Sequence, residues 1–133
     1  LECHDGPAEE LIARLVNHEL DVVLSDAPAQ GSFQGKIFHH LLGTCGVSFL
    51  STRSLATSRR RDFPRSLNKA PFLLPTKSSP LRKEFDQWCD SLGLQVEVRA
   101  EFDDSALMKA FGQEGVGIFP VPSAVEREIC QQY

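Results

Sequence analysis

The spacing of apolar residues along the chain predicts helices and strands that alternate. Apolar residues at positions 11, 12, 15 and 16 recur at helical spacing after Pro7, which suits the first turn of a helix. Short apolar runs of strand length are found at residues 20–26, 37–42, 46–51, 71–76 and 115–120. Strands that alternate with helices favour an α/β fold with a largely parallel sheet.

The strongest helical pattern lies at residues 80–92. Ser79 is a suitable N-cap, Pro80 suits the first helical position, and Gly93 suits the left-handed turn that ends many helices. The apolar face of this helix is predicted to consist of Leu81, Phe85, Trp88 and Leu92. Burial of each such side chain stabilises a fold by roughly 1.5–3 kcal/mol before the loss of entropy, so this face is expected to dock the helix.

Residues 94–102 alternate between apolar and polar side chains, the pattern of a half-covered strand at the edge of a sheet. Asp103 or Asp104 then caps a predicted helix that ends at Gly112, and we expect Asp103 to be the cap. The inward side chains of this helix are predicted to be Leu107, Met108 and Phe111. Direct cation binding or paired acid–base chemistry by the two aspartates is less favoured, because adjacent side chains diverge at a helix start.

A last helix is predicted at residues 123–131. Composition changes after Thr52, where residues 53–70 are polar and basic with little periodicity. This segment predicts a connection between a first lobe at residues 1–52 and a second lobe at residues 53–133. Its basic run SRRRD is interpreted as a solvated stretch, with anion contact as the alternative.

The composition is that of a globular protein without a general attraction for nucleic acid. The chain has 133 residues, 41% of them hydrophobic and 24% charged, with a formal net charge of −4. No apolar run approaches the ~18–20 residues that span a bilayer, so no membrane contact is expected. The four cysteines lie far apart without a CxxC pair, which favours reduced thiols in a cytoplasmic protein.

Neither catalysis nor a cofactor is expected. The chain has no nucleophile elbow, phosphate loop or metal-ligand spacing. His39 and His40 are adjacent on a predicted strand, so their side chains point to opposite faces and would chelate one metal poorly. Cys3, His4 and Asp5 are too close along the chain to form a nucleophile with its base.

The order of these segments resembles the effector-binding domain of LysR-type transcriptional regulators. LDVVLSD at residues 20–26 resembles the family's LD-apolar-apolar-I strand, and GVGIFPVPS at residues 115–123 resembles its GxGIAxLP segment. CGVSF at residues 45–49 and EFDDSALMKAFG at residues 101–112 are most similar to a member that regulates a sodium/proton antiporter. The resemblance spans essentially the whole chain.

The resemblance implies an α/β, two-lobed, periplasmic-binding-protein-like (type II) fold with a ligand cleft between the lobes. Relative to the family, the effector domain is expected to be incomplete at both ends and to lack the N-terminal winged helix-turn-helix. Unpaired sheet edges left by the missing segments predict weak stability or a partner chain that covers them. The implied function is effector sensing and dimerisation in a cytoplasmic activator that responds to sodium or lithium, controls an antiporter, and contacts DNA only through the missing domain.

The resemblance also implies an effector site where strands end and helices begin, facing the cleft. The residues assigned to it are Ser25, Asp26, Thr76, Lys77, Ser78, Ser79, Phe102, Asp103 and Phe119. Residues 76–79 would cap the next helix in any case, and pocket lining would add to that role. A homodimer or higher homo-oligomer would use Leu81, Phe85 and Trp88. The alternative function is a solute-binding protein of the same fold, which would need export.

Overall fold

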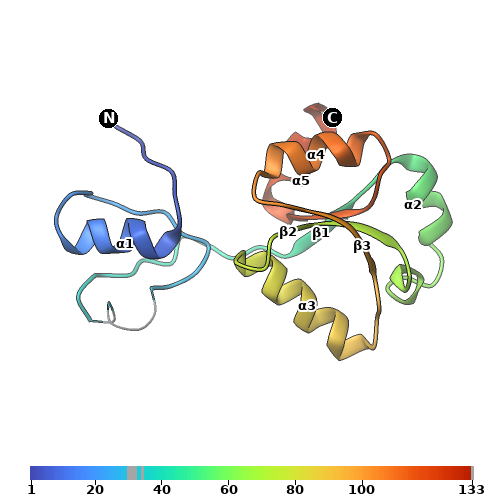
Figure 1. The fold of residues 1–133 in the computed structure, drawn as a ribbon, viewed down its shortest axis with the longest axis horizontal. Helices are drawn as coiled ribbons and strands as arrows, with labels where there is room; N and C mark the ends of the chain where they lie inside the picture. The colour runs from blue at the N-terminus through green and yellow to red at the C-terminus, as the bar shows by residue number, and fades with distance from the viewer. Residues whose placement is uncertain (30–32, 34, 133) are drawn as a thin grey trace. The chain divides into compact units, whose positions relative to one another are not determined.

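The computed structural model describes residues 1–29, 33 and 35–132, and the chain forms two compact units, Leu1–Gly43 and Thr44–Tyr133 (Figure 1). The helices and strands, in chain order, are α1 (Ala8–Val16), β1 (Val47–Leu50), α2 (Arg53–Arg59), η2 (Arg65–Leu67), β2 (Pro71–Pro75), α3 (Pro80–Leu92), β3 (Glu97–Phe102), α4 (Ser105–Gln113), β4 (Phe119–Pro122), η3 (Ser123–Val125) and α5 (Glu126–Gln132). The elements η2 and η3 are short 3-10 helices. None of the helices in the described ranges is long and apolar enough to cross a membrane.

In the first unit, the helix predicted after Pro7 is confirmed as α1. Its buried residue is Ile12, which lies within the apolar spacing seen in the sequence. Glu9 and Glu10 lie in the first turn and Arg14 lies in the last, an arrangement that complements the helix dipole. Amphipathic spacing and end charges together account for this helix.

The strands predicted at residues 20–26 and 37–42 are wrong. Neither segment is a strand, and Val22, Leu24 and Phe38 are 74%, 77% and 94% exposed. A strand needs a neighbour for its N–H and C=O groups. The described part of the first unit holds no strand that could serve as that neighbour.

The second unit has two two-stranded sheets, one parallel and one antiparallel, whereas a largely parallel sheet was predicted. β2 and β3 pair in parallel, with Pro75 opposite Phe102, and β1 and β4 pair antiparallel. A parallel bridge between Phe72 and Ile118 joins the two pairs, and the Ile118 N–H donates to the Pro71 carbonyl at 2.8 Å. The order is therefore β3–β2–β4–β1. Because β1 and β4 are far apart in sequence, no local pattern sets their direction.

Both faces of β2 are covered, which explains its unbroken apolar run. Figure 1 shows α3 on one side of the strands and α4 and α5 on the other. Phe72 and Leu74 belong to the core that includes residues of α3, and Leu73 belongs to the core that includes residues of α4 and α5. All three are 0% exposed. Alternate residues of one strand thus supply two cores.

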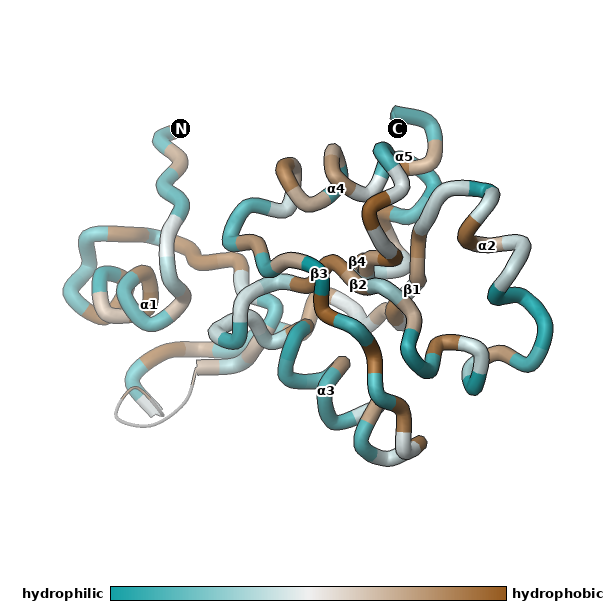
Figure 2. The backbone as a smooth tube through the Cα atoms, turned by 45° about the vertical axis from the view of Figure 1, so that its right-hand side comes forward, coloured by the Kyte–Doolittle hydropathy of each residue, from teal (hydrophilic) through white to brown (hydrophobic). Residues whose placement is uncertain are grey.

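α3 has the predicted bounds but not the predicted buried face. Gly93 ends it with a left-handed φ of 65°, as predicted, whereas Ser79 makes no side-chain cap. The buried residues of α3 are Arg82, Phe85 and Cys89. Leu92, predicted to be inward, is 47% exposed. The rest of α3 is mostly hydrophilic (teal in Figure 2), so the buried stripe is narrow and one of its members is charged.

Residues 53–70 are folded, whereas a connection without regular structure was predicted. α2 begins this segment, and the Arg59 guanidinium donates to the Ser66 carbonyl at 2.7 Å. The Ser66 hydroxyl donates in return to the Arg59 carbonyl at 2.5 Å. Leu67 is buried in the core beneath α3. These are contacts between turns of the chain, so apolar periodicity does not reveal them.

The lobe boundary predicted at Thr52 stays a prediction. The compact second unit begins at Thr44 and includes β1, the strand predicted at residues 46–51, because β1 pairs with β4. The predicted strand at residues 115–120 is shifted to β4, and the helix predicted at residues 123–131 forms as η3 followed by α5. β3 is an edge strand among the described residues, as predicted.

α4 lies close to β4. Met108 is buried as predicted, whereas Leu107 and Phe111, also predicted to be inward, are 50% and 43% exposed. Gly112 lies against the Phe119 ring, and a Cβ atom at this position would clash with that ring. α4 therefore contacts the sheet through a small residue, which lets the helix approach closely.

Candidate functional site

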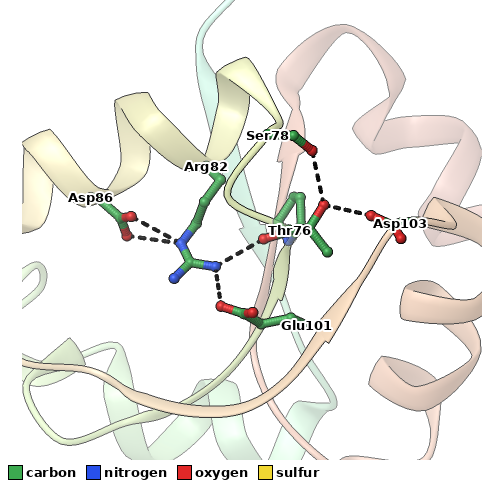
Figure 3. Close-up of polar contacts among 7 residues, drawn as sticks. Thr76, Ser78, Arg82, Asp86, Glu101 and Asp103 are labelled. Carbon is green, nitrogen blue, oxygen red and sulfur yellow. Dashed lines mark hydrogen bonds and ion pairs between the residues drawn. The ribbon is translucent and has the colours of Figure 1, made fainter. Parts of the chain in front are cut away.

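Six of the predicted effector residues, those at positions 76–79, 102 and 103, lie at the carboxyl ends of β2 and β3. Because these strands are parallel and in register at their ends, Thr76 and Asp103 follow them side by side. The Thr76 N–H donates to the Phe102 carbonyl at 3.0 Å, which continues the ladder by one residue. The Thr76 hydroxyl donates to Asp103 Oδ1 at 2.6 Å and lies 3.2 Å from Ser78 Oγ (Figure 3). We call Thr76, Ser78 and Asp103 the polar cluster.

The segment between β2 and α3 is a tight turn. The Ser79 N–H donates to the Thr76 carbonyl at 3.0 Å, and the Ser79 carbonyl accepts from the first turn of α3. Lys77 and Ser78, at the middle of the turn, are exposed. The polar cluster therefore lies beside the N-terminus of a 13-residue helix, where free amides and the helix dipole favour anionic and polar groups.

Asp103 and Asp104 have separate roles. Asp104 is the N-cap of α4, and its Oδ1 accepts from the Ala106 N–H at 2.7 Å and from the Leu107 N–H at 3.3 Å. The prediction that Asp103 caps this helix is wrong, because the cap must directly precede the first helical residue. Asp103 is thereby left to bond Thr76 instead.

The two carboxylates bond different partners and do not converge on one point. No group of three or more histidine, cysteine, aspartate or glutamate side chains suited to a metal ion is found within the described ranges. The arrangement at the polar cluster is therefore one of hydroxyls and a single carboxylate. Such a set can donate and accept hydrogen bonds.

Arg82 is a buried residue that sequence reasoning missed. It is 5% exposed, and its Nε donates to both carboxylate oxygens of Asp86 at 3.0 Å, an i to i+4 pair on α3. Its Nη1 donates to the Pro75 carbonyl at 2.9 Å and to Glu101 Oε1 at 2.6 Å (Figure 3). Pro75 and Glu101 lie just before the residues of the polar cluster on β2 and β3, so Arg82 joins the ends of both strands to α3.

The charge of Arg82 is secured by its partners. Burial by itself would lower the pKa of the guanidinium, but hydrogen bonds and charges from Glu101 and Asp86 outweigh burial and raise the pKa above its ordinary value. The arginine therefore stays charged, and the strand ends that carry the polar cluster are held by a charge-assisted network. The only sequence signal for this network is the i to i+4 spacing of Arg82 and Asp86. That spacing does not reveal burial, because ion pairs on a helix surface have the same spacing.

Three predicted effector residues lie in other parts of the chain: two in the first unit and one in the core of the second. Ser25 and Asp26 belong to the first unit, where Ser25 Oγ donates to the Ala27 carbonyl at 2.7 Å in a local turn. Phe119 is 4% exposed and lies in the core beside Gly112. The roles predicted for these residues in effector binding stay predictions.

The residues predicted for the dimer interface differ in accessibility. Leu81 and Trp88 are half-buried, whereas Phe85 is 4% exposed. The Phe85 ring lies 5.0 Å from the Phe72 ring and 5.9 Å from the Phe49 ring, centre to centre. Phe85 is therefore mainly a core residue of its own chain, and the dimer face stays a prediction.

All four cysteines are free: Cys3, Cys45, Cys89 and Cys130. Cys89 alone is buried, and burial, with smaller contributions from Asp86 and Asp90, raises the pKa of its thiol to about 11. The thiol is therefore protonated at neutral pH and packs as a small apolar side chain.

Comparison with known proteins agrees with the resemblance seen in the sequence. The LysR substrate binding domain family matches residues 1–132. The transcriptional activator proteins NhaR of Escherichia coli (strain K12) and of Shigella flexneri are each 38% identical to the chain over 123 residues. Those matches cover 92% of this chain and 40% of each relative, so the chain spans less than half the length of these proteins. No solved structure matches the chain. The chain belongs to the family of LysR substrate binding domains.

Proposed function

We propose that this chain is the effector-sensing part of a LysR-type transcriptional activator and that the polar cluster contacts the effector. The observation that carries the proposal is the placement of Thr76, Ser78 and Asp103 at the carboxyl ends of two parallel strands. In α/β proteins ligands bind at this edge of the sheet, where strand ends and helix starts present polar groups. The buried Arg82 network supports the proposal, because it fixes both strand ends.

The hydrogen bonds of the polar cluster leave groups available for a ligand. The Thr76 hydroxyl donates to Asp103 Oδ1, while Asp103 Oδ2 makes no hydrogen bond with any residue in the described ranges. Ser78 Oγ is exposed and contacts only Thr76 in that part of the chain. A ligand with a donor group or a positive charge suits these oxygens.

We further propose that the effector is sodium or lithium and that the intact regulator controls an antiporter. The support is the similarity of residues 101–112 to a sodium/proton antiporter regulator. Small hard cations prefer oxygen ligands, and the polar cluster offers two hydroxyls and one carboxylate. Three such ligands do not complete the coordination of a cation, so water or other oxygen ligands would have to supply the rest.

The test is the thermal stability of the intact regulator in sodium, lithium and potassium chlorides at equal ionic strength. We expect higher melting temperatures in sodium and lithium than in potassium, and we expect Thr76→Val and Asp103→Asn to remove that difference. Thr57→Val is the matched control, because Thr57 is an exposed hydroxyl on α2 that bonds only its own helix. A sodium effect that survives in both site variants would exclude the polar cluster, and equal melting in all three salts would exclude the ions.

We also propose that the protein acts in the cytoplasm as a homodimer that contacts DNA only through a domain outside this chain. The four free cysteines and the relatives' names as transcriptional activators favour this over an exported solute-binding protein. The segment that precedes Leu1 in the intact gene product decides between them: a helix-turn-helix supports the regulator, and an export leader supports the solute-binding protein. Sedimentation that finds only monomer at high concentration would exclude the dimer.

A further inference from the structure

The second unit has a recess whose chemistry differs from that of the polar cluster. It is a groove of about 400 Å³ lined by Val47, Phe49, Phe63, Glu84, Phe85 and Trp88. The lining comes from β1, from the turn that follows α2, and from α3. It shares no residue with the polar cluster, so its occupant can be tested independently of the effector. We call it the aromatic groove.

The rings of the aromatic groove face in several directions. The Phe49 ring is at the centre: it stacks on Trp88 at 5.3 Å with an interplanar angle of 29°. It meets Phe63 at 6.3 Å and 52°, and it meets Phe85 at 5.9 Å and 66°. Rings inclined to one another in this way can contact a rounded ligand on more than one side. Phe63 is 56% exposed, so one wall is open to solvent.

The charge of the aromatic groove is negative. Glu84 is the charged residue of its lining. It is exposed and makes no hydrogen bond or ion pair with the residues that the structure describes. The faces of aromatic rings carry partial negative charge and attract cations. An anion would be repelled by both features, and a bare metal ion would find one carboxylate and no other oxygen ligand in the lining.

We propose that the aromatic groove binds a small organic ammonium ion, such as a quaternary ammonium or a methylated amine. The methyl groups, which share the positive charge, lie against the rings of Phe49, Phe63 and Trp88, and the Glu84 carboxylate neutralises the charge at the rim. Aromatic rings with a nearby carboxylate are the chemistry by which proteins bind such cations. The domain thereby has a second ligand site that is separate from the polar cluster.

The single tryptophan of the chain reports on this site directly, because Trp88 lines the groove. The 133-residue chain is titrated with choline chloride at constant ionic strength while Trp88 fluorescence is followed. The matched control ligand is 3,3-dimethylbutan-1-ol, which has the shape of choline without its charge. We expect a saturable change with choline at an affinity about fivefold or more above that of the neutral alcohol. Equal affinities, or no saturable change, would overturn the proposal, and this comparison needs no variant.

Two variants with matched controls locate the cation. Glu84→Gln should weaken choline binding about three- to fivefold, the range of a solvent-exposed charge pair. Phe63→Leu should weaken it to a similar extent, because an apolar side chain remains but the ring does not. The controls are Glu114→Gln and Phe111→Leu, which alter an exposed carboxylate and an exposed ring at α4. Choline affinity that is unchanged in Glu84→Gln, or equally reduced in the controls, would overturn the assignment.

Two further measurements test whether the polar cluster contributes to choline binding and whether a second copy of the chain fills the groove. Thr76→Val should leave choline affinity unchanged, because Thr76 is not in the lining. Phe85 and Trp88 line the groove and are also predicted dimer residues, so a second copy of the chain is the competing occupant. Fluorescence that depends on protein concentration and not on choline would show that a second copy fills the groove, which would overturn the proposal. If the intact regulator shows no sodium response, the proposed effector fails, but the choline titration still tests the aromatic groove, because the two sites share no residue.

Discussion

Two apolar runs in this chain differ in secondary structure and in burial. Residues 20–26 and β2 are both short apolar runs, but Leu73 in β2 is 0% exposed and Leu24 in the first run is 77% exposed. β2 pairs with β3 on one side, and on its other side Phe72 is bridged to Ile118. Helices cover both faces of β2. Residues 20–26 have no strand beside them in the described part of the first unit. The difference teaches that an apolar run becomes a strand only where neighbours bond its backbone and cover its side chains.

The first unit therefore leaves several large apolar side chains exposed to solvent. Its exposed large apolar residues are Leu1, Val22, Leu24, Phe38, Leu41 and Leu42. A large exposed apolar patch is typical of a surface that another segment or another molecule covers. This agrees with the expectation of weak stability or a covering partner for the first lobe, which stays a prediction.

Replacing matched leucines gives the largest expected effect. Leu73→Ala should lower the free energy of unfolding of the second unit by about 2–5 kcal/mol, because it leaves a cavity between two cores. Leu24→Ala should change stability by less than about 0.5 kcal/mol, since Leu24 is already exposed. Urea unfolding followed by Trp88 fluorescence and by circular dichroism measures both. A loss in Leu24→Ala as large as in Leu73→Ala would show that residues 20–26 are buried in the working protein.

Matched arginines extend the contrast to charged residues. Arg82→Met should destabilise the second unit by about 1–3 kcal/mol, because Glu101 and the Pro75 carbonyl lose a buried donor. The half-exposed carboxylates of Asp86 and Glu101 can regain water, which keeps the loss below that of a fully buried pair. Arg99→Met, which breaks the exposed pair with Glu97, should cost less than about 0.5 kcal/mol. Equal urea midpoints for the two variants would contradict the role given to Arg82.

The buried Cys89 and the exposed Cys130 should affect the pH dependence of stability differently. The raised pKa of Cys89, about 11 against an ordinary value of 9.0, means that the folded state favours the neutral thiol. Its contribution is fully present below about pH 9 and is lost as pH rises towards and past 11, by at most about 3 kcal/mol. Cys89→Val should remove this part of the alkaline loss in urea titrations, and Cys130→Val, at an exposed position, should not. Identical alkaline profiles for the wild type and Cys89→Val would contradict it.

The parts of the fold that were predicted correctly have local signals. The bounds of α3 follow from Pro80 and Gly93, and β2 follows from an apolar run between prolines. In both elements, residues close together in the sequence carry the information. Thr76 and Asp103 were assigned to one site through the family resemblance, which implies a site where strands end.

The parts that were missed depend on contacts between distant residues. The antiparallel pairing of β1 with β4 has no local pattern, and α2 is held by bonds between Arg59 and Ser66. Arg82 looks like a surface residue because its partners, the Pro75 carbonyl and Glu101, are on two strands. Phe63 was placed in a connection without regular structure, so the aromatic groove could not be foreseen.

The adjacent aspartates give the smallest stability effect and the sharpest separation of roles. Asp104→Ala should lower stability by about 1 kcal/mol and speed amide exchange in the first turn of α4, because the Ala106 and Leu107 N–H groups lose their acceptor. Asp103→Ala should lower it by less than half as much, since its bond to Thr76 is exposed and the Thr76 hydroxyl can turn to water. The order reverses for ligand response, because only Asp103 belongs to the polar cluster. Equal amide exchange in α4 for both variants would mean that the two carboxylates share the cap, and the polar cluster would then lose its charged group.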